Sequence, residues 1–261
     1  MDARPVGMFD SGVGGLSVLE CFRAMAPNER VTYFADTAWF PYGPRPAAEV
    51  RKRSFAITQR LLASDVKLIV VACNTASAAA IDDLRQAFNV PFVGMVPGVK
   101  PAASGSRSGR VIILATPGTF DGALYSRVVD DFGRGAKIVA VPGTGLAELV
   151  ERGETDTETA RTKLSQVLGP EVRAGADTIV LGCTHYHFLA PDIRALFPGV
   201  TIVDTSEAVA RRALQVLHEL AQLAPNEQSG SLDLIVSGDR DAFRAAMARV
   251  GFEPEDVEAR R

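Results

Sequence analysis

Short apolar runs recur along the chain, and each is followed by a small-residue loop and then by a stretch with helical spacing of apolar positions. Runs such as LIVVA and VIILA are apolar at every position, which is typical of parallel strands buried on both faces of a sheet. Alternation of such strands with helices predicts an α/β fold. The expected strands are residues 6–9, 31–35, 68–72, 91–95, 111–115, 137–141, 178–182, 201–204 and 232–237, and the expected helices are residues 15–25, 47–63, 76–87, 122–131, 158–168 and 206–222.

The strands form two groups that resemble each other. MFDSGVGG at 8–15 has the strand-then-turn pattern of LATPGTF at 114–120, and VVACNTASAA at 70–79 resembles VLGCTHYHFL at 180–189. In the latter two segments, an apolar strand ends on a small residue, followed by Cys, by Thr within two residues and by a helix. This weak duplication predicts two similar doubly wound α/β domains in a pseudo-symmetric arrangement, with the active site in the cleft between them.

The Pro- and Gly-rich segment PGVKPAASGSRSG (97–109) is the expected crossover between the two halves. We expect residues 1–97 together with 207–261 to form the first domain, and residues 98–206 to form the second. The final segment, EPEDVEARR (253–261), is polar and is expected to fray.

Charge and composition exclude several classes of protein. The 28 basic and 31 acidic residues give a formal net charge of −3, so we expect no nucleic-acid partner. The N-terminus lacks a charged region followed by an apolar one, and no apolar run approaches the roughly 20 residues that span a bilayer. The three cysteines argue against a disulfide framework. We therefore expect a cytoplasmic protein without membrane association.

In open α/β sheets, ligands bind beyond the carboxyl ends of the strands. Four loops that leave such ends carry reactive or anion-binding groups: Asp10-Ser11-Gly12, Tyr42-Gly43, Cys73-Asn74-Thr75 and Cys183-Thr184-His185. A thiol at the start of a helix lies among free backbone N–H groups, so we expect its pKa to fall below the usual value of about 8.5. Cys21 lies in a helical pattern without polar companions and is interpreted as a small hydrophobic residue.

Two thiols on opposite walls of a cleft fit the inversion of a carbon next to a carboxylate. One thiolate removes the Cα proton from one face while the other thiol donates a proton to the opposite face, and the roles exchange in the reverse direction. Cys73 and Cys183 are the candidate pair. No Lys stands in an obvious Schiff-base setting, and SGVGG lacks the G-x-G-x-x-G spacing, so no cofactor is indicated.

The polar neighbours of the two thiols have candidate roles. Asp10 would orient or deprotonate Cys73, or accept a substrate ammonium group, and it is also a candidate helix N-cap. His185 would serve Cys183 in the same way. Glu151 is a possible auxiliary group or, alternatively, a surface helix carboxylate. Hydroxyl, amide and backbone N–H groups for a substrate carboxylate come from Ser11, Asn74, Thr75 and Thr184.

Other uses of Cys and His remain open to different degrees. The chain has no C-x-x-C or H-x-x-x-H motif, so a zinc site would be incomplete and no metal is expected. A Cys-dependent hydrolase or lyase could use His185 as base, although such an enzyme would not require a second cysteine. A binding protein without activity is a further alternative, against which the intact reactive residues argue.

Five segments resemble the signature segments of bacterial glutamate racemases: FDSGVGGLSVL (9–19), DTAWFPYG (36–43), ACNTASA (72–78), LGCTHYHFL (181–189) and SGDRDAF (237–243). The resemblance implies cofactor-independent interconversion of L- and D-glutamate, which supplies D-glutamate for peptidoglycan, and a homodimer. The family's catalytic cysteines match Cys73 and Cys183. Its substrate-binding segments match Asp10-Ser11, Tyr42-Gly43, Asn74-Thr75 and Thr184-His185.

Some positions depart from the pattern of this family. Trp39, Phe40 and His187 replace residues that are common in relatives, and GMVPGVKPA (94–102) lacks a Glu that many relatives carry. None of these departures involves a thiol. Racemases of other amino acids, such as aspartate, share the cysteine pair and remain an alternative, although the Cys-Thr-His-Tyr run favours glutamate.

Overall fold

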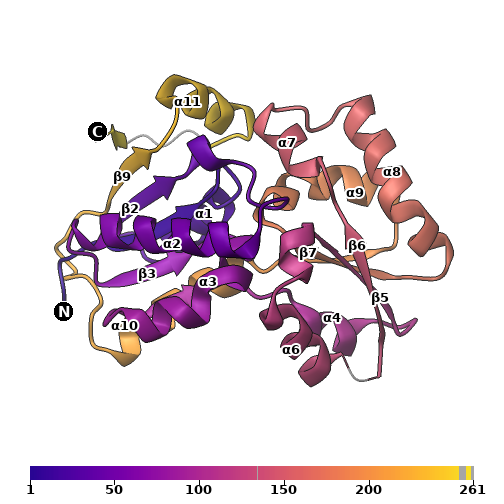
Figure 1. The fold of residues 1–261 in the computed structure, drawn as a ribbon, viewed down its shortest axis with the longest axis horizontal. Helices are drawn as coiled ribbons and strands as arrows, with labels where there is room; N and C mark the ends of the chain where they lie inside the picture. Colours follow the sequence, from indigo (N-terminus) through magenta and orange to yellow (C-terminus); the bar gives the residue numbers. More distant parts are fainter. Residues whose placement is uncertain (134, 253–256, 260–261) are drawn as a thin grey trace.

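Two parallel β-sheets, each with helices on both faces, lie side by side in the protein (Figure 1). The computed structural model describes residues 1–133, 135–252 and 257–259. The first sheet has the order β10-β9-β2-β1-β3-β4 and consists of β1 (Val6–Asp10), β2 (Arg30–Ala35), β3 (Leu68–Val71), β4 (Phe92–Gly94), β9 (Ser231–Val236) and β10 (Val257–Ala259). The second has the order β6-β5-β7-β8 and consists of β5 (Arg110–Ala115), β6 (Lys137–Pro142), β7 (Thr178–Gly182) and β8 (Thr201–Val203).

Helices make the connections that parallel strands require. Those of the first domain are α1 (Leu16–Met25), α2 (Ala47–Leu62), α3 (Asn74–Ala87), α10 (Ser206–Glu219), α11 (Arg240–Arg249) and the short helix η1 (Thr37–Trp39). Those of the second are α4 (Val99–Gly105), α5 (Pro117–Phe120), α6 (Ala123–Phe132), α7 (Leu146–Glu151), α8 (Glu158–Arg173), α9 (Ala190–Leu196) and the short helix η2 (Thr184–Leu189). Within the described residues, no helix is long and apolar enough to cross a membrane.

Successive residues of the central strands serve opposite faces of each sheet. In β1, Met8 shares a hydrophobic cluster with residues of α1 and α10, whereas Phe9 shares one with residues of α2 and α3. In β5, Leu114 belongs to the cluster that includes α7 and α8, whereas Ile113 belongs to the cluster of α4 and α6. Both faces are covered, and for this reason the strands are apolar at every position.

The two sheets have the same topology. When β1–β4 are matched to β5–β8, the orders β2-β1-β3-β4 and β6-β5-β7-β8 are identical. The sheet registers also match, because Phe9 pairs with Val71 in one sheet and Leu114 pairs with Leu181 in the other. The predicted fold class, with its two similar doubly wound domains, is therefore confirmed. The exact boundaries of these domains stay a prediction.

Each expected strand and helix is present, with three differences. α8 continues past residue 168 to Arg173 because the helix accommodates Pro170 in its interior, where the sequence suggested a stop. The crossover 97–109 contains α4, whose Pro101 lies in the first turn, where its missing N–H is not needed. Of the tail expected to fray, 257–259 form β10 beside β9, whereas 253–256 and 260–261 lie outside the described residues.

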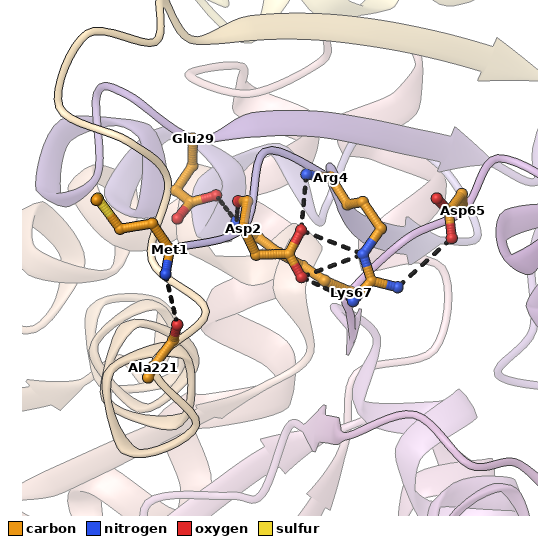
Figure 2. A network of polar contacts seen from close by, with 7 residues as sticks. All are labelled: Met1, Asp2, Arg4, Glu29, Asp65, Lys67 and Ala221. Atoms are coloured by element: carbon orange, nitrogen blue, oxygen red, sulfur yellow. Dashed lines mark hydrogen bonds and ion pairs between the residues drawn. The ribbon is translucent and has the colours of Figure 1, made fainter.

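A buried ion pair lies at the amino ends of β2 and β3 in the first domain, whereas Cys73 follows the carboxyl end of β3 (Figure 2). Lys67, which precedes β3, has its Nζ 2.7 Å from Oε2 of Glu29, which precedes β2. Lys67 also donates to the carbonyl oxygen of Asp2 at 2.7 Å, and Glu29 Oε1 accepts from the Ala224 N–H at 2.8 Å. The pair thus ties the N-terminal segment and the chain after α10 to the sheet.

Candidate active site

A cavity of about 100 Å³ is lined by residues that follow strands of both sheets. Ser11 follows β1, Cys73 follows β3, Thr116 follows β5 and Cys183 follows β7. All strands are parallel, so their carboxyl ends meet at the same edge of each sheet, and the two edges face each other across the cavity. The sequence-predicted residues that line it are Ser11, Tyr42, Gly43, Cys73, Asn74, Thr75, Cys183, Thr184 and His185.

The two cysteines have nearly the same backbone conformation at equivalent positions. Each is the residue before the first turn of a helix, with φ −145° and ψ 121° at Cys73 and φ −147° and ψ 135° at Cys183. Both are free thiols and both are buried. The structure therefore brings the predicted pair together at one cavity, each thiol on a different domain.

Asp10 is the titratable partner of Cys73. It is fully buried at the end of β1, and its Oδ2 accepts hydrogen bonds from Gly12 N–H at 3.3 Å and Gly15 N–H at 3.0 Å. The residue that caps α1 is Gly15, so Asp10 binds the N-terminus of this helix without being its N-cap. Burial raises the pKa of the Asp10 carboxyl, although interactions with His185 and Cys73 oppose that shift.

The expectation of a lowered thiol pKa is wrong for Cys73. Burial raises the pKa of this thiol well above its usual value, and the neighbouring Asp10 raises it further. A backbone hydrogen bond from Ala76 at the start of α3 acts in the opposite direction but does not outweigh desolvation. In the first domain, burial therefore shifts the pKa of both the Cys73 thiol and the Asp10 carboxyl upward.

His185 is the partner of Cys183 in the second domain. Its Nδ1 lies 3.9 Å from the Cys183 sulfur, and its Nε2 lies 2.8 Å from Oε1 of Glu151. Burial alone would lower the pKa of His185, but the hydrogen bonds with Cys183 and Glu151 outweigh it and raise the pKa well above its usual value. His185 therefore favours its protonated form while it faces the Cys183 sulfur.

Glu151 also joins the two domains. It lies at the end of α7, and its Oε1 accepts a hydrogen bond from Val13 N–H of the first domain at 2.7 Å. A Cβ at Gly12 or Gly14 would overlap Glu151 or His185, so only glycine permits this close approach. The possible auxiliary role of Glu151 therefore has a structural basis, and the alternative of a surface carboxylate is wrong because Glu151 is only partly exposed.

The cavity lining also includes the hydroxyls of Thr75 and Thr116 and the amide of Asn74. Thr75 Oγ1 lies 2.8 Å from Thr116 Oγ1, which in turn lies 3.0 Å from Thr119 Oγ1. The side-chain oxygen and nitrogen of Asn74 are buried and have no hydrogen-bond partner among the described residues. Such groups can bind a carboxylate, and the orphaned amide of Asn74 indicates that a ligand completes the site.

Sequence reasoning missed Thr116, which lines the cavity, and Thr119, which supports it through the hydroxyl contact. When the two sheets are aligned by strand register, Phe9 corresponds to Leu114, and two residues further along the chain Ser11 corresponds to Thr116. The similarity of MFDSGVGG to LATPGTF could have revealed Thr116, because it is the counterpart of Ser11, which was predicted to bind the ligand.

Tyr42 contributes its ring and backbone rather than a hydroxyl directed at a ligand. The phenol donates to Oδ2 of the buried Asp36 at 2.5 Å. Burial raises the pKa of Tyr42, and Asp36 raises it further. The carbonyl oxygen of Gly43 accepts from Gly118 N–H at 3.0 Å, which joins this loop to the second domain.

No group of three or more His, Cys, Asp or Glu side chains within the described residues is arranged to hold a metal ion.

The family of the chain follows from comparison with known proteins. The model of the Asp/Glu/Hydantoin racemase family matches residues 16–213. A glutamate racemase from Herpetosiphon aurantiacus is 45% identical over 244 residues, which cover 93% of this chain and 96% of that protein. The chain belongs to the Asp/Glu/Hydantoin racemase family.

Solved structures of racemases share the whole architecture. A glutamate racemase from Thermus thermophilus, solved with β-chloro-D-alanine, superposes with a TM-score of 0.87 at 38% identity and covers 100% of this chain and 98% of its own. The Escherichia coli glutamate racemase, solved with L-glutamate and an activator, UDP-MurNAc-Ala, gives a TM-score of 0.83 at 33% identity, with 98% of both chains covered. The predicted membership of the racemase family is thereby confirmed.

Three of the four departures from the family pattern, at Trp39, Phe40 and His187, make defined contacts. The ring of Trp39 lies against two arginines, and the ring of Phe40 packs on His185. His187 has its Nδ1 2.6 Å from Oδ2 of Asp204. None of the three belongs to the set of polar groups around the thiols, but Phe40 contacts one member of that set.

Proposed function

We propose that the protein interconverts L- and D-glutamate by a two-base mechanism in which Cys73 and Cys183 act on opposite faces of Cα. The observation that supports this most directly is the placement of two free cysteines, in equivalent backbone conformations, on opposite walls of one cavity. The similarity to glutamate racemases over nearly the whole chain supports glutamate as the substrate.

In the proposed direction from L-glutamate, the Cys183 thiolate removes the Cα proton and the Cys73 thiol donates its proton to the opposite face. The products are D-glutamate, a Cys183 thiol and a Cys73 thiolate, and the reverse reaction restores the starting state. The raised pKa of Cys73 favours its thiol form, which suits a group that supplies a proton, and the Asp10 carboxyl lies beside it. As imidazolium, His185 would stabilise the Cys183 thiolate; after a turnover it would release its own proton to solvent and then take the proton of the Cys183 thiol, which restores the starting state on this side.

The substrate carboxylates would be bound by neutral groups. We propose that Asn74, Thr75 and Thr184 supply these contacts with Ser11 and Thr116, because all of them line the cavity. Asp10 would serve Cys73; it is fully buried and is not among the residues that line the cavity, so its contact with a substrate ammonium group stays a prediction. Gly43 would complete the wall beside Tyr42. The mechanism needs no cofactor, since both proton carriers are side chains.

The proposed biological role is the supply of D-glutamate for peptidoglycan in the cytoplasm by a homodimer. This role rests on the resemblance to bacterial glutamate racemases.

The direct test follows the circular dichroism of L-glutamate and of D-glutamate with purified, metal-chelated, cofactor-free protein under reducing conditions. We expect both signals to decay to zero. Decay with aspartate but not with glutamate would keep the two-thiol chemistry and replace the substrate. If neither amino acid loses its signal, a Cys-dependent hydrolase or lyase becomes the leading alternative.

A further inference from the structure

An aromatic ring from the first domain packs on the imidazole of the second. The rings of Phe40 and His185 have their centroids 5.4 Å apart with an interplanar angle of 41°. His185 is only 2% exposed, and its two nitrogens face Cys183 and Glu151. Phe40 therefore covers part of the ring surface that these polar partners leave uncovered.

The segment that carries Phe40 is anchored immediately before it. The ring of Trp39 lies 5.0 Å from the guanidinium carbon of Arg45 and 5.4 Å from that of Arg53. Arg45 Nε donates to the Trp39 carbonyl oxygen at 2.9 Å. These contacts hold the backbone of Trp39 through one hydrogen bond and its ring through two cations.

The same segment is anchored again on the other side of Phe40. Arg53 donates to both carboxylate oxygens of the buried Asp36, at 2.7 and 2.5 Å, and Tyr42 donates to one of them. A bidentate arginine–carboxylate pair fixes direction as well as distance. Because Trp39 and Tyr42 are both held, Phe40 between them has little freedom to leave His185.

We propose that Phe40 is a positioning residue for His185. Its ring keeps the imidazole turned so that Nε2 meets Glu151 while Nδ1 faces the Cys183 sulfur, and the Trp39–Arg45–Arg53 cluster keeps Phe40 in place. The inference rests on the proposed function, because it assigns His185 to proton transfer at Cys183. In this role the Phe40 ring acts through the imidazole of His185, whereas a residue that only lines the cavity would act on the substrate.

The contact between Phe40 and His185 is expected to affect the orientation of the imidazole more than the binding of glutamate. The titratable groups that face His185 are Cys183, Glu151 and Asp10, and Phe40 adds a neutral surface to them. An imidazole that can rotate away from Cys183 spends less time in the geometry that transfers a proton. The rate of turnover should then fall while the affinity for glutamate, which the polar groups of the cavity set, changes little.

The test compares Phe40→Leu, Phe40→Tyr and Trp39→Leu in steady-state racemisation of glutamate. We expect Phe40→Leu to lower kcat about three- to tenfold with KM within about twofold of the wild-type value. Phe40→Tyr, which keeps the aromatic ring, should restore most of kcat. Trp39→Leu should reproduce the loss of kcat in weaker form, since this ring supports Phe40 from outside the cavity.

Phe132→Leu is the matched control, because Phe132 is exposed at the end of α6, away from the cavity, and its ring also faces a cation, Lys100. Thermal unfolding of every variant shows whether the fold is kept. A Phe40→Leu enzyme with wild-type kcat, or with a raised KM at unchanged kcat, would show that the ring is only a cavity wall. A folded Phe40→Tyr variant that is as slow as Phe40→Leu would also overturn the proposal.

His185→Asn separates failure of the inference from failure of the proposed function. If the wild-type protein racemises glutamate and His185→Asn keeps its kcat, His185 has no part in proton transfer and the positioning role falls with it. If His185→Asn is slow and Phe40→Leu is normal, the proposed function stands and the inference about Phe40 is wrong. A wild-type protein inactive on glutamate would overturn the function itself.

Discussion

Thr75 and His185 occupy equivalent positions in the two domains, each two residues after the cysteine that follows the third strand of its sheet. In the same alignment Asp10 is equivalent to Ala115, so the first domain has a carboxyl group at a position where the second domain has a methyl group. Each thiol thus has a titratable partner, but the partner comes from a different element. The pseudo-symmetry of the fold brings the sulfurs into register, whereas the proton chemistry around them is asymmetric.

This asymmetry predicts that Asp10 controls the reactivity of Cys73 toward alkylation. Asp10 raises the pKa of Cys73, so Asp10→Asn should increase the thiolate fraction of Cys73 at a given pH and accelerate its labelling by iodoacetamide. Racemisation should fall by about 10²- to 10⁴-fold, as is usual when a general acid or base is lost. Site-resolved mass spectrometry measures the labelling, with Cys21 as the internal reference. Slower or unchanged labelling of Cys73 would contradict the assigned interaction.

The strand pattern allowed the fold and the positions of both thiols to be predicted, because buried parallel strands are uniformly apolar and ligand groups follow their carboxyl ends. The packing of Phe40 on His185 and the hydrogen bond from Val13 to Glu151 could not be predicted. Both join residues of different domains, and their meeting depends on how two sheets dock. The raised pKa of Cys73 was missed because burial outweighed the helix terminus, and burial is a tertiary property.

The buried pair of Lys67 and Glu29 should contribute to stability through charge compensation (Figure 2). Lys67→Met leaves the Glu29 carboxylate buried without its cation, so we expect the free energy of unfolding to fall by about 3–5 kcal/mol. Adding Glu29→Gln removes the orphaned charge and keeps an acceptor for the Ala224 N–H, so the double variant should recover most of the loss. Urea denaturation at neutral pH measures all three proteins.

Arg4→Met is the control for that prediction. Arg4 pairs with Asp2 and Asp65 in the same region, but its side chain is 42% exposed. An exposed pair of this kind contributes at most about 1 kcal/mol. If Lys67→Met destabilises the protein no more than Arg4→Met does, the burial of the lysine pair carries no special cost.

The pair of His187 and Asp204 should make stability depend on pH. The hydrogen bond with Asp204 raises the pKa of His187 above its unfolded value of about 6.5, and burial opposes this shift without reversing it. The contribution of His187 is therefore fully present below about pH 6.5 and is lost as the pH rises through the raised folded value. Burial raises the pKa of Asp204, but its bonds with His187 and Ser206 outweigh burial and lower it, so its contribution persists until the pH falls through that lowered value.

His187→Gln should consequently flatten the stability profile between pH 6 and pH 9. The two side chains are 39% and 29% exposed, so solvent screening limits the difference to less than about 1 kcal/mol. Urea midpoints of wild type and variant at both pH values give the comparison, with His218→Gln as control because His218 is exposed on α10. An equal loss of stability in wild type and His187→Gln on going to pH 9 would remove the assignment.

Gly12 should be intolerant of a single added methyl group, because the two domains meet there. A Cβ at this position would overlap Oε1 of Glu151 and approach Nε2 of His185 to 3.3 Å. The backbone itself does not require glycine, since φ at Gly12 is not positive, so the cost of Gly12→Ala arises from the displaced side chains. We expect kcat/KM for glutamate to fall at least about tenfold, because Glu151 and with it His185 must shift.

Gly105→Ala provides the matched substitution without a contact, since a Cβ there meets nothing within 4 Å at the end of α4, and its activity should equal that of the wild type. A double variant decides how Gly12→Ala acts. If the methyl group acts by displacing Glu151, then Gly12→Ala combined with Glu151→Ala should be no slower than Glu151→Ala alone, because the clash has gone with the carboxylate. Fully multiplicative losses in the double variant would mean that the methyl group disturbs the site by another route, such as the hydrogen bonds of the Asp10 loop. The ratio of these rates therefore tests whether Gly12→Ala acts by displacing Glu151 from its place beside His185.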